Sequence, residues 1–242
     1  MPSSDDPAAL AARLEEIASA GGVRAFGAAD LGKALERSPD LFDRIGSRFA
    51  RAVVMAIPLN PSSLDGVADR PTPIYFHAYR QLNYRLDDAA FAVEQALIAE
   101  GHRSLAIAAS QIVSHDPPRG HVSHRHMAVA AGLGWIGRSG LLVTPRYGAR
   151  VRLVTILTDA PLEAGREMAF SCGRCAACVA PCPAGAIGRR PEDYNLAACY
   201  AKLTEFTRIP YVGQHICGVC VKACGPDNPG RAVDKAGNPR EA

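Results

Sequence analysis

The 242-residue chain lacks the long apolar runs that cross membranes, because no stretch of 18 consecutive apolar residues occurs in it. It also lacks a strong charge of either sign, since 27 basic residues stand against 24 acidic ones for a net charge of +3. This balance argues against nucleic acid as the main partner, although it leaves room for a local basic face. Apart from two groups of cysteines, we find no internal repeat of 20 to 50 residues.

The first residues, Met1 to Pro7, contain neither the basic start nor the apolar stretch of a secretory signal. This absence favours a cytoplasmic protein with no membrane association. Cysteines stay reduced in that compartment, so structural disulfides are not expected.

Hydrophobic periodicity predicts an α/β domain over residues 1–165. We expect helices over 8–20, 84–100 and 123–131, and strands over 52–58, 104–109, 141–144 and 151–157. Residues 60–73, rich in Pro, Ser, Asp and Gly, are expected to form a loop. The last two strands are expected to pair as a hairpin through the turn 145–148, where Gly148 supplies an unusual backbone angle.

The composition changes near residue 166, and every cysteine lies beyond that point. We therefore expect a second, cysteine-rich domain over 166–230 and a flexible tail over 231–242. The first cysteine group has the spacing C-x2-C-x2-C-x3-C-P of bacterial ferredoxins and consists of Cys172, Cys175, Cys178 and Cys182. The second group consists of Cys199, Cys217, Cys220 and Cys224.

Eight thiolates satisfy two [4Fe–4S] clusters with none left over. In two-cluster ferredoxins the fourth cysteine of a run binds the other cluster. This pattern, with Cys199 placed by elimination, assigns one cluster to Cys172, Cys175, Cys178 and Cys224. The other cluster is assigned to Cys182, Cys199, Cys217 and Cys220. Structural zinc is the alternative for C-x2-C pairs, but the longer ferredoxin run favours iron–sulfur. One departure from the pattern is that Gly225, not proline, follows Cys224.

The segment 132–137 fits the dinucleotide-binding pattern G-x-G-x-x-G literally. In a dinucleotide-binding fold the motif follows a strand and opens a helix. Here a predicted helix precedes it and a predicted strand follows it, so we do not expect NAD binding. A tight structural turn packed around Trp135, the only tryptophan, is the simplest interpretation.

Several motifs in one order resemble the epoxyqueuosine reductase family, which is related to the reductive dehalogenases. They are Ala131–Arg138, Leu141–Leu142, Pro145–Gly148, the ferredoxin run and Cys199–Thr204. The resemblance extends from about residue 50 to 228. It implies a nitroreductase-like α/β domain that binds a corrinoid (cobalamin), followed by a ferredoxin-like domain with two clusters. It also implies that a glycine-containing loop lies against the corrin, formed by Gly132, Leu133, Gly134, Trp135, Ile136, Gly137 and Arg138.

The chain departs from the family before this loop. The family's proton-donating aspartate would fall at Pro118, two residues from Asp116, so Asp116 is the candidate proton donor. His126 is a second candidate, because histidines donate protons near neutral pH and four lie close together, at 115, 121, 124 and 126. Metal binding or ordinary packing are the alternatives for these histidines.

The family usually continues into a helical repeat domain that helps to hold tRNA, whereas this chain ends 18 residues after Cys224. We therefore expect an oxidoreductase that acts on a small molecule, or on a corrinoid carried by another protein, rather than on tRNA. An external donor of the ferredoxin or flavodoxin type would supply its electrons. The alternatives are an electron-transfer module for a partner enzyme, and a reductase that uses flavin in place of the corrinoid.

Overall fold

The computed structural model describes residues 6–35, 48–226 and 233–234. They form two compact units, each assembled from separate stretches of chain. The first unit draws on Met1–Pro58, Leu82–Leu133 and Arg152–Glu167. The second draws on Leu59–Gln81, Gly134–Val151 and Met168–Ala242. Packing thus brings 59–81 and 134–151 together with the cysteine-rich segment, while the division predicted between residues 165 and 166 stays a prediction from composition.

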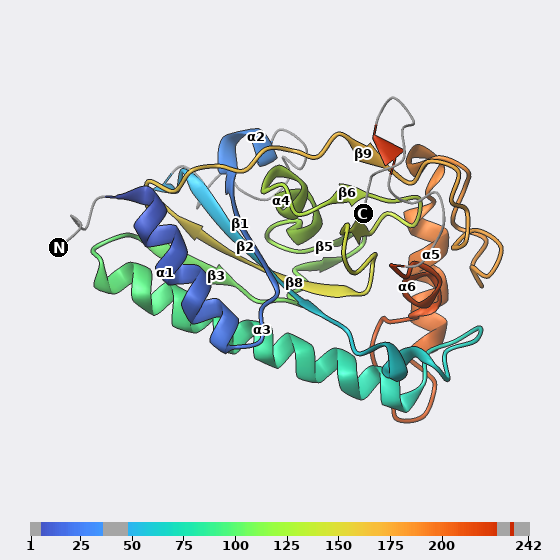
Figure 1. The fold of residues 1–242 in the computed structure, drawn as a ribbon. Helices are drawn as coiled ribbons and strands as arrows, with labels where there is room; N and C mark the ends of the chain where they lie inside the picture. The colour runs from blue at the N-terminus through green and yellow to red at the C-terminus, as the bar shows by residue number, and fades with distance from the viewer. Residues whose placement is uncertain (1–5, 36–47, 227–232, 235–242) are drawn as a thin grey trace. The chain divides into compact units, whose positions relative to one another are not determined.

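A four-stranded sheet organises the first unit, in the order β1-β2-β8-β3 (Figure 1). The strands are β1 (Ala25–Asp30), β2 (Arg51–Pro58), β8 (Val151–Thr158) and β3 (Ser104–Ile107). The pairs β1–β2 and β3–β8 are antiparallel. The central strand β2 is buried from Ala52 to Ala56, so it needs cover on both faces of the sheet.

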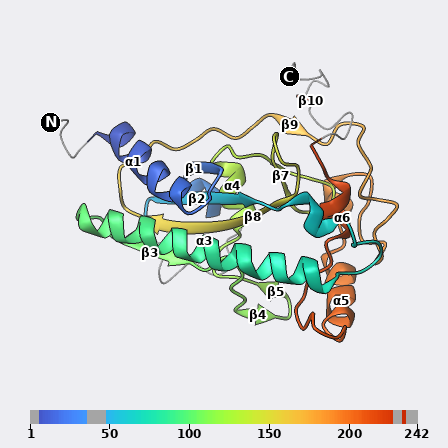
Figure 2. The same cartoon turned by 60° about the horizontal axis from the view of Figure 1, so that its bottom comes forward.

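Helices α1 (Pro7–Ala20) and α3 (Pro73–Ala99) cover one face of this sheet, and α4 (His124–Ala130) covers the other (Figures 1 and 2). Leu14 of α1 and Val93 of α3 pack in one cluster with Met55 of β2. On the other side, α4 contacts β1, β2 and the short α2 (Leu31–Leu35). The sheet therefore carries two hydrophobic layers.

Local hydrogen bonds determine where helices α1 and α3 begin. Asp6 accepts a hydrogen bond from the Ala8 N–H and precedes Pro7, which confirms the predicted start of α1. Helix α3 begins eleven residues before the predicted Tyr84, because the Thr72 hydroxyl accepts a hydrogen bond from the Tyr75 N–H at its first turn. The segment before α3 is mainly loop, as predicted, with one short 3₁₀ helix, η2 (Pro61–Leu64).

The hairpin predicted between residues 141–144 and 151–157 is wrong. Strand β7 (Leu142–Val143) pairs with β6 (Trp135–Ile136), whereas β8 lies between β2 and β3. The apolar length of β8 explains this, since burial from Val154 to Thr158 requires a central place in a sheet. The turn between them is closed by two backbone hydrogen bonds joining Thr144 and Gly148, whose φ of 64° is the left-handed angle expected there.

The second unit contains η2, the first turns of α3 and a series of short elements. These are β6, β7, β9 (Phe170–Ser171), β10 (Val233–Asp234), η3 (Pro191–Asp193), α5 (Leu196–Phe206) and α6 (Val219–Ala223). The Lys222 ammonium of α6 donates to the carbonyls of Asp65 and Val67, each at 2.8 Å. Of the tail predicted over 231–242, β10 is described and pairs with β9; the rest lies outside the described residues. In the described part of the chain, no helix combines the length and hydropathy needed to cross a membrane.

Candidate functional site

None of the eight cysteines forms a disulfide, and all lie half-buried in the second unit. The structure brings them together in two sets. Cys178 has Cys224, Cys172 and Cys175 as its electrostatic neighbours. Cys220 has Cys217, Cys199 and Cys182 in its surroundings, together with Cys178 from the other set. The ferredoxin pattern assigns these cysteines to two clusters, with Cys182 and Cys224 exchanged, and that assignment stays a prediction.

The environment of the thiols resists ionisation. Burial raises the pKa of Cys178 to about 11, and the neighbouring Cys224, Cys172 and Cys175 add to the rise. Burial likewise raises the pKa of Cys217 to about 11, and it raises the pKa of Cys220 as well. Burial also raises the pKa of Cys199, while a hydrogen bond with Tyr194 opposes that shift. Grouped thiolates in such a setting need a cationic centre between them, which is what iron supplies, so the donor set fits clusters.

The backbone around the first group is arranged by local turns. Gly173 has a φ of 50°, and the Cys175 N–H donates to the Cys172 carbonyl at 2.9 Å. The Arg138 side chain donates hydrogen bonds to two carbonyls of this turn. Its Nε donates to the Cys175 carbonyl at 2.8 Å and its Nη2 donates to the Gly173 carbonyl at 2.7 Å. The guanidinium therefore fixes the loop that presents the first thiols.

The glycine motif has α4 before it and a strand, β7, after it, as the sequence predicts, while β6 lies within the motif itself. Its glycines are required by the protein's own packing. A Cβ on Gly134 would lie 2.2 Å from the Val143 carbonyl oxygen, and one on Gly132 would lie 2.6 Å from that of Arg166. A Cβ on Gly137 would lie 2.6 Å from the Val143 Cγ2 and 3.4 Å from the Cys172 Sγ. Residues 134–138 thus line the first cysteine group, and their contact with a corrin stays a prediction.

Trp135 is buried beside the same group, with 4% of its surface exposed. It packs with Val143 and Ala149, and Phe170, Cys172 and Cys224 pack against this small cluster. The centroids of the Trp135 and Phe170 rings are 5.9 Å apart. The indole Nε1 is fully buried and has no hydrogen-bond partner among the described residues. This buried N–H donor therefore lacks an acceptor, within an apolar group against which two cysteines pack.

The two proposed proton donors lie in the first unit. Asp116 is exposed on the turn between β4 (Ser114–His115) and β5 (Pro118–Arg119). His126 lies in the first turn of α4, with its Nδ1 buried. Within 6–35, 48–226 and 233–234, no three His, Cys, Asp or Glu side chains form a group able to hold a single metal ion. The catalytic roles of Asp116 and His126 stay predictions.

His124, also on α4, has a distinct structural role. Its Nδ1 lies 2.8 Å from the Thr155 hydroxyl and its Nε2 lies 3.1 Å from the Ala108 carbonyl oxygen. Because that carbonyl only accepts, Nε2 carries the proton and the hydroxyl donates to Nδ1. Burial lowers the pKa of His124 to about 4, and the nearby Arg152 cation lowers it further, while the Ala108 hydrogen bond opposes them. The imidazole is therefore neutral at pH 7.

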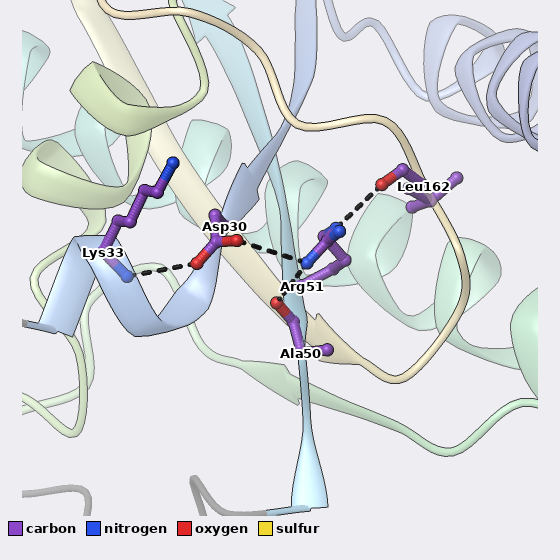
Figure 3. A network of polar contacts seen from close by, with 5 residues as sticks. All are labelled: Asp30, Lys33, Ala50, Arg51 and Leu162. Atoms are coloured by element: carbon purple, nitrogen blue, oxygen red, sulfur yellow. Dashed lines mark hydrogen bonds and ion pairs between the residues drawn. The ribbon is translucent and has the colours of Figure 1, made fainter.

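A cleft of about 430 Å³ opens in the first unit, and sequence reasoning missed it. It is lined by Asp30, Lys33, Ala130, Ala164, Gly165, Arg166 and Glu167. The Asp30 carboxylate accepts from the Lys33 N–H at 3.1 Å and pairs with the Arg51 guanidinium at 3.4 Å (Figure 3). Arg51 also donates to the Leu162 carbonyl at 2.8 Å, which ties the edge of the sheet to the chain after β8. The ammonium of Lys33 extends away from this network (Figure 3).

No protein-family model matches the chain. Curated relatives do match it. It is 35% identical over 115 residues to the epoxyqueuosine reductase of Gloeobacter violaceus, which is 43% of this chain and 36% of that protein. It is 40% identical over 86 residues to that of Listeria monocytogenes, which is 36% of this chain and 22% of that protein. The resemblance to epoxyqueuosine reductases is confirmed. The matched parts make up about a third or less of these two relatives.

Solved structures share the fold. A catabolic reductive dehalogenase, NpRdhA, superposes with a TM-score of 0.73 at 19% identity, covering 92% of this chain and 32% of that one. The epoxyqueuosine reductase of Bacillus subtilis superposes with a TM-score of 0.58 at 22% identity, covering 94% of this chain and 68% of that one. The mixed α/β fold is therefore that of both protein types.

Proposed function

We propose that this chain is an iron–sulfur, corrinoid-dependent reductase of a small substrate. The observation that carries the proposal is the gathering of eight thiols into two sets of four within one unit. When bound, the clusters supply one-electron transfer and the corrinoid supplies the cobalt at which the substrate is reduced. The resemblance to epoxyqueuosine reductases supports the same reaction class.

The proposal divides the roles between the units. The second unit would be the ferredoxin-like part. Cys172, Cys175, Cys178 and Cys224 would hold one cluster, and Cys182, Cys199, Cys217 and Cys220 the other. Arg138 would keep the first loop in shape through its two carbonyl contacts. The first unit would be the nitroreductase-like part, in which Asp116 or His126 would donate a proton to the substrate.

Two observations support the proposal that the chain binds a corrinoid. The segment 132–138 has the sequence that the resemblance places against a corrin. One dehalogenase of the same fold has a structure that suggests a mechanism for B12-dependent dehalogenation. We further propose a cytoplasmic setting, since reduced cysteines persist there. A ferredoxin- or flavodoxin-type protein would donate the electrons. The small net charge supports a small molecule, or a corrinoid on another protein, as substrate in preference to tRNA.

Anaerobic reconstitution tests the proposal directly. The chain would be loaded with iron and sulfide, then offered cobalamin, and its EPR spectrum recorded before and after reduction. We expect signals of reduced [4Fe–4S] clusters together with that of bound cob(II)alamin lacking its lower nitrogen ligand. A Cys178→Ser variant provides the control, since it should lose one cluster signal and keep cobalamin uptake.

Other outcomes would redirect the assignment. Clusters without cobalamin uptake, together with tight flavin binding, would replace the corrinoid by flavin. Clusters with neither cofactor, and with electron delivery to a partner, would make the chain an electron-transfer module. Turnover of modified tRNA would contradict the small-substrate part alone.

A further inference from the structure

The buried indole of Trp135 has a donor without an acceptor. Its Nε1 is shielded from solvent, and no described residue accepts its hydrogen bond. Buried N–H groups in folded proteins nearly always have a partner, because an unmet donor loses the hydrogen bonds that water provided. The acceptor is therefore a group that the polypeptide itself does not supply at this position.

The surroundings of the indole include sulfur-bearing residues. The apolar cluster around Trp135 includes Val143 and Ala149, which offer only hydrocarbon side chains. The sulfur-bearing neighbours packed against it are Cys172 and Cys224. These two thiols come from opposite ends of the cysteine-rich segment and are predicted to bind the same [4Fe–4S] cluster. A cluster held between them would bring thiolate and sulfide sulfurs, which accept hydrogen bonds, next to the indole.

We propose that the Trp135 N–H donates a hydrogen bond to a sulfur of the cluster held by Cys172, Cys175, Cys178 and Cys224, and thereby raises the reduction potential of that cluster. This inference rests on the proposed iron–sulfur function. Hydrogen bonds to the sulfurs are one of the factors that set cluster potentials, since they stabilise the more negative, reduced form. The hairpin β6–β7 would hold the donor in place, because Trp135 pairs with Val143 there.

The effect is expected at one cluster only. The chain has a single tryptophan, so the second group receives no indole donor. Its cysteines have other partners, among them Tyr194 for Cys199 and the Val219 backbone for Cys217. The second cluster therefore serves as an internal reference in the same molecule.

The single tryptophan also makes isotope labelling specific. The full chain would be produced with ¹⁵N-indole tryptophan, reconstituted, and examined by pulsed EPR with one cluster reduced at a time. We expect a ¹⁵N coupling in the spectrum of one reduced cluster, and its loss in unlabelled protein. No coupling to either cluster would overturn the proposal.

Replacing the donor gives the second test. Trp135→Phe keeps an aromatic ring and removes the N–H, and an EPR-monitored redox titration would follow both clusters. We expect one potential to fall, so that the ratio of reduced to oxidised cluster at fixed solution potential drops about tenfold, equal to about 59 mV for one electron. The second potential should stay unchanged.

Two controls separate the hydrogen bond from packing. Phe170→Leu disturbs the ring partner of Trp135 but keeps the donor, so it should leave the potential near the wild-type value. Benzothienylalanine in place of tryptophan keeps the indole shape without the N–H. It should therefore reproduce the fall in reduction potential, even if Trp135→Phe assembles its clusters poorly. Unchanged potentials with benzothienylalanine, or an equal fall in Phe170→Leu, would overturn the proposal. Wild-type protein that assembles no clusters would instead refute the proposed function itself.

Discussion

Replacement of His124 by glutamine should remove a defined part of the pH dependence of stability. In the unfolded chain the imidazole has a pKa of about 6.5. In the folded chain burial lowers it to about 4. The unfolded state therefore takes up a proton at a pH where the folded state does not. The stabilising contribution is complete above pH 6.5 and is lost as the pH falls toward 4.

The size of the effect follows from these two values. Between pH 7.5 and 5.5 this single group should lower the free energy of unfolding by about 1 kcal/mol. Protonation of the unfolded state dominates in this pH range. A glutamine amide can donate to the Ala108 carbonyl and accept from the Thr155 hydroxyl, so His124→Gln retains both partners without titrating.

Urea unfolding at pH 7.5 and 5.5, under anaerobic conditions with clusters assembled, measures the difference. Wild-type protein should lose about 1 kcal/mol more than His124→Gln on acidification. His115→Gln, at an exposed position on β4, serves as the matched control and should behave like wild type. An equal pH dependence in wild type and His124→Gln would refute the neutral, hydrogen-bonded imidazole.

Three further predictions concern the second unit. Gly137→Ala should lower the free energy of unfolding by about 1–3 kcal/mol, because the new Cβ would lie 2.6 Å from the Val143 Cγ2. Thermal unfolding measures this loss. Gly66→Ala is the control, since a Cβ on Gly66 would lie 3.4 Å from its nearest neighbour. Equal thermal shifts in the two variants would contradict the close approach. Arg138→Lys should accelerate the loss of one cluster to an iron chelator, because an ammonium cannot donate to both carbonyls as the planar guanidinium does. Loss of both clusters at one rate would argue against this role. Removal of iron should raise the fluorescence of the sole tryptophan several-fold, because Cys172 and Cys224 pack against the apolar group that contains Trp135. Unchanged emission would place the first cluster elsewhere.

Local sequence signals predicted much of the fold. The Asp6–Pro7 start of α1 and the apolar strand β2 depend on neighbouring residues, so their positions followed from the sequence. The start of α3 did not, because its first turns carry tyrosine, histidine and arginine, which obscure the periodicity, and because Thr72 acts as a cap. The pairing of β7 with β6 was missed for another reason. Neighbours in sequence suggested a hairpin with β8, whereas long-range burial decided the place of β8.

The candidate site was likewise predicted only in part from the sequence. The cysteine spacing identified the segment that carries the candidate site, because cluster geometry restricts which residues of a loop can reach one cluster. The carbonyl contacts of Arg138 and the burial of the Trp135 N–H were beyond sequence reasoning. Both depend on a hairpin meeting a loop about 35 residues later in the chain. The structural role of His124 was missed because its partners, Ala108 and Thr155, lie on other segments and carry no motif.

The proposed function requires two [4Fe–4S] clusters held by two interleaved sets of cysteines. Mössbauer spectra with iron and sulfide analysis of wild type, Cys178→Ser and Cys220→Ser test it most directly. We predict about eight iron and eight sulfide atoms per wild-type chain, and about half in each variant, with a different cluster missing from each. Zinc in place of iron, or the same cluster missing from both variants, would contradict the account.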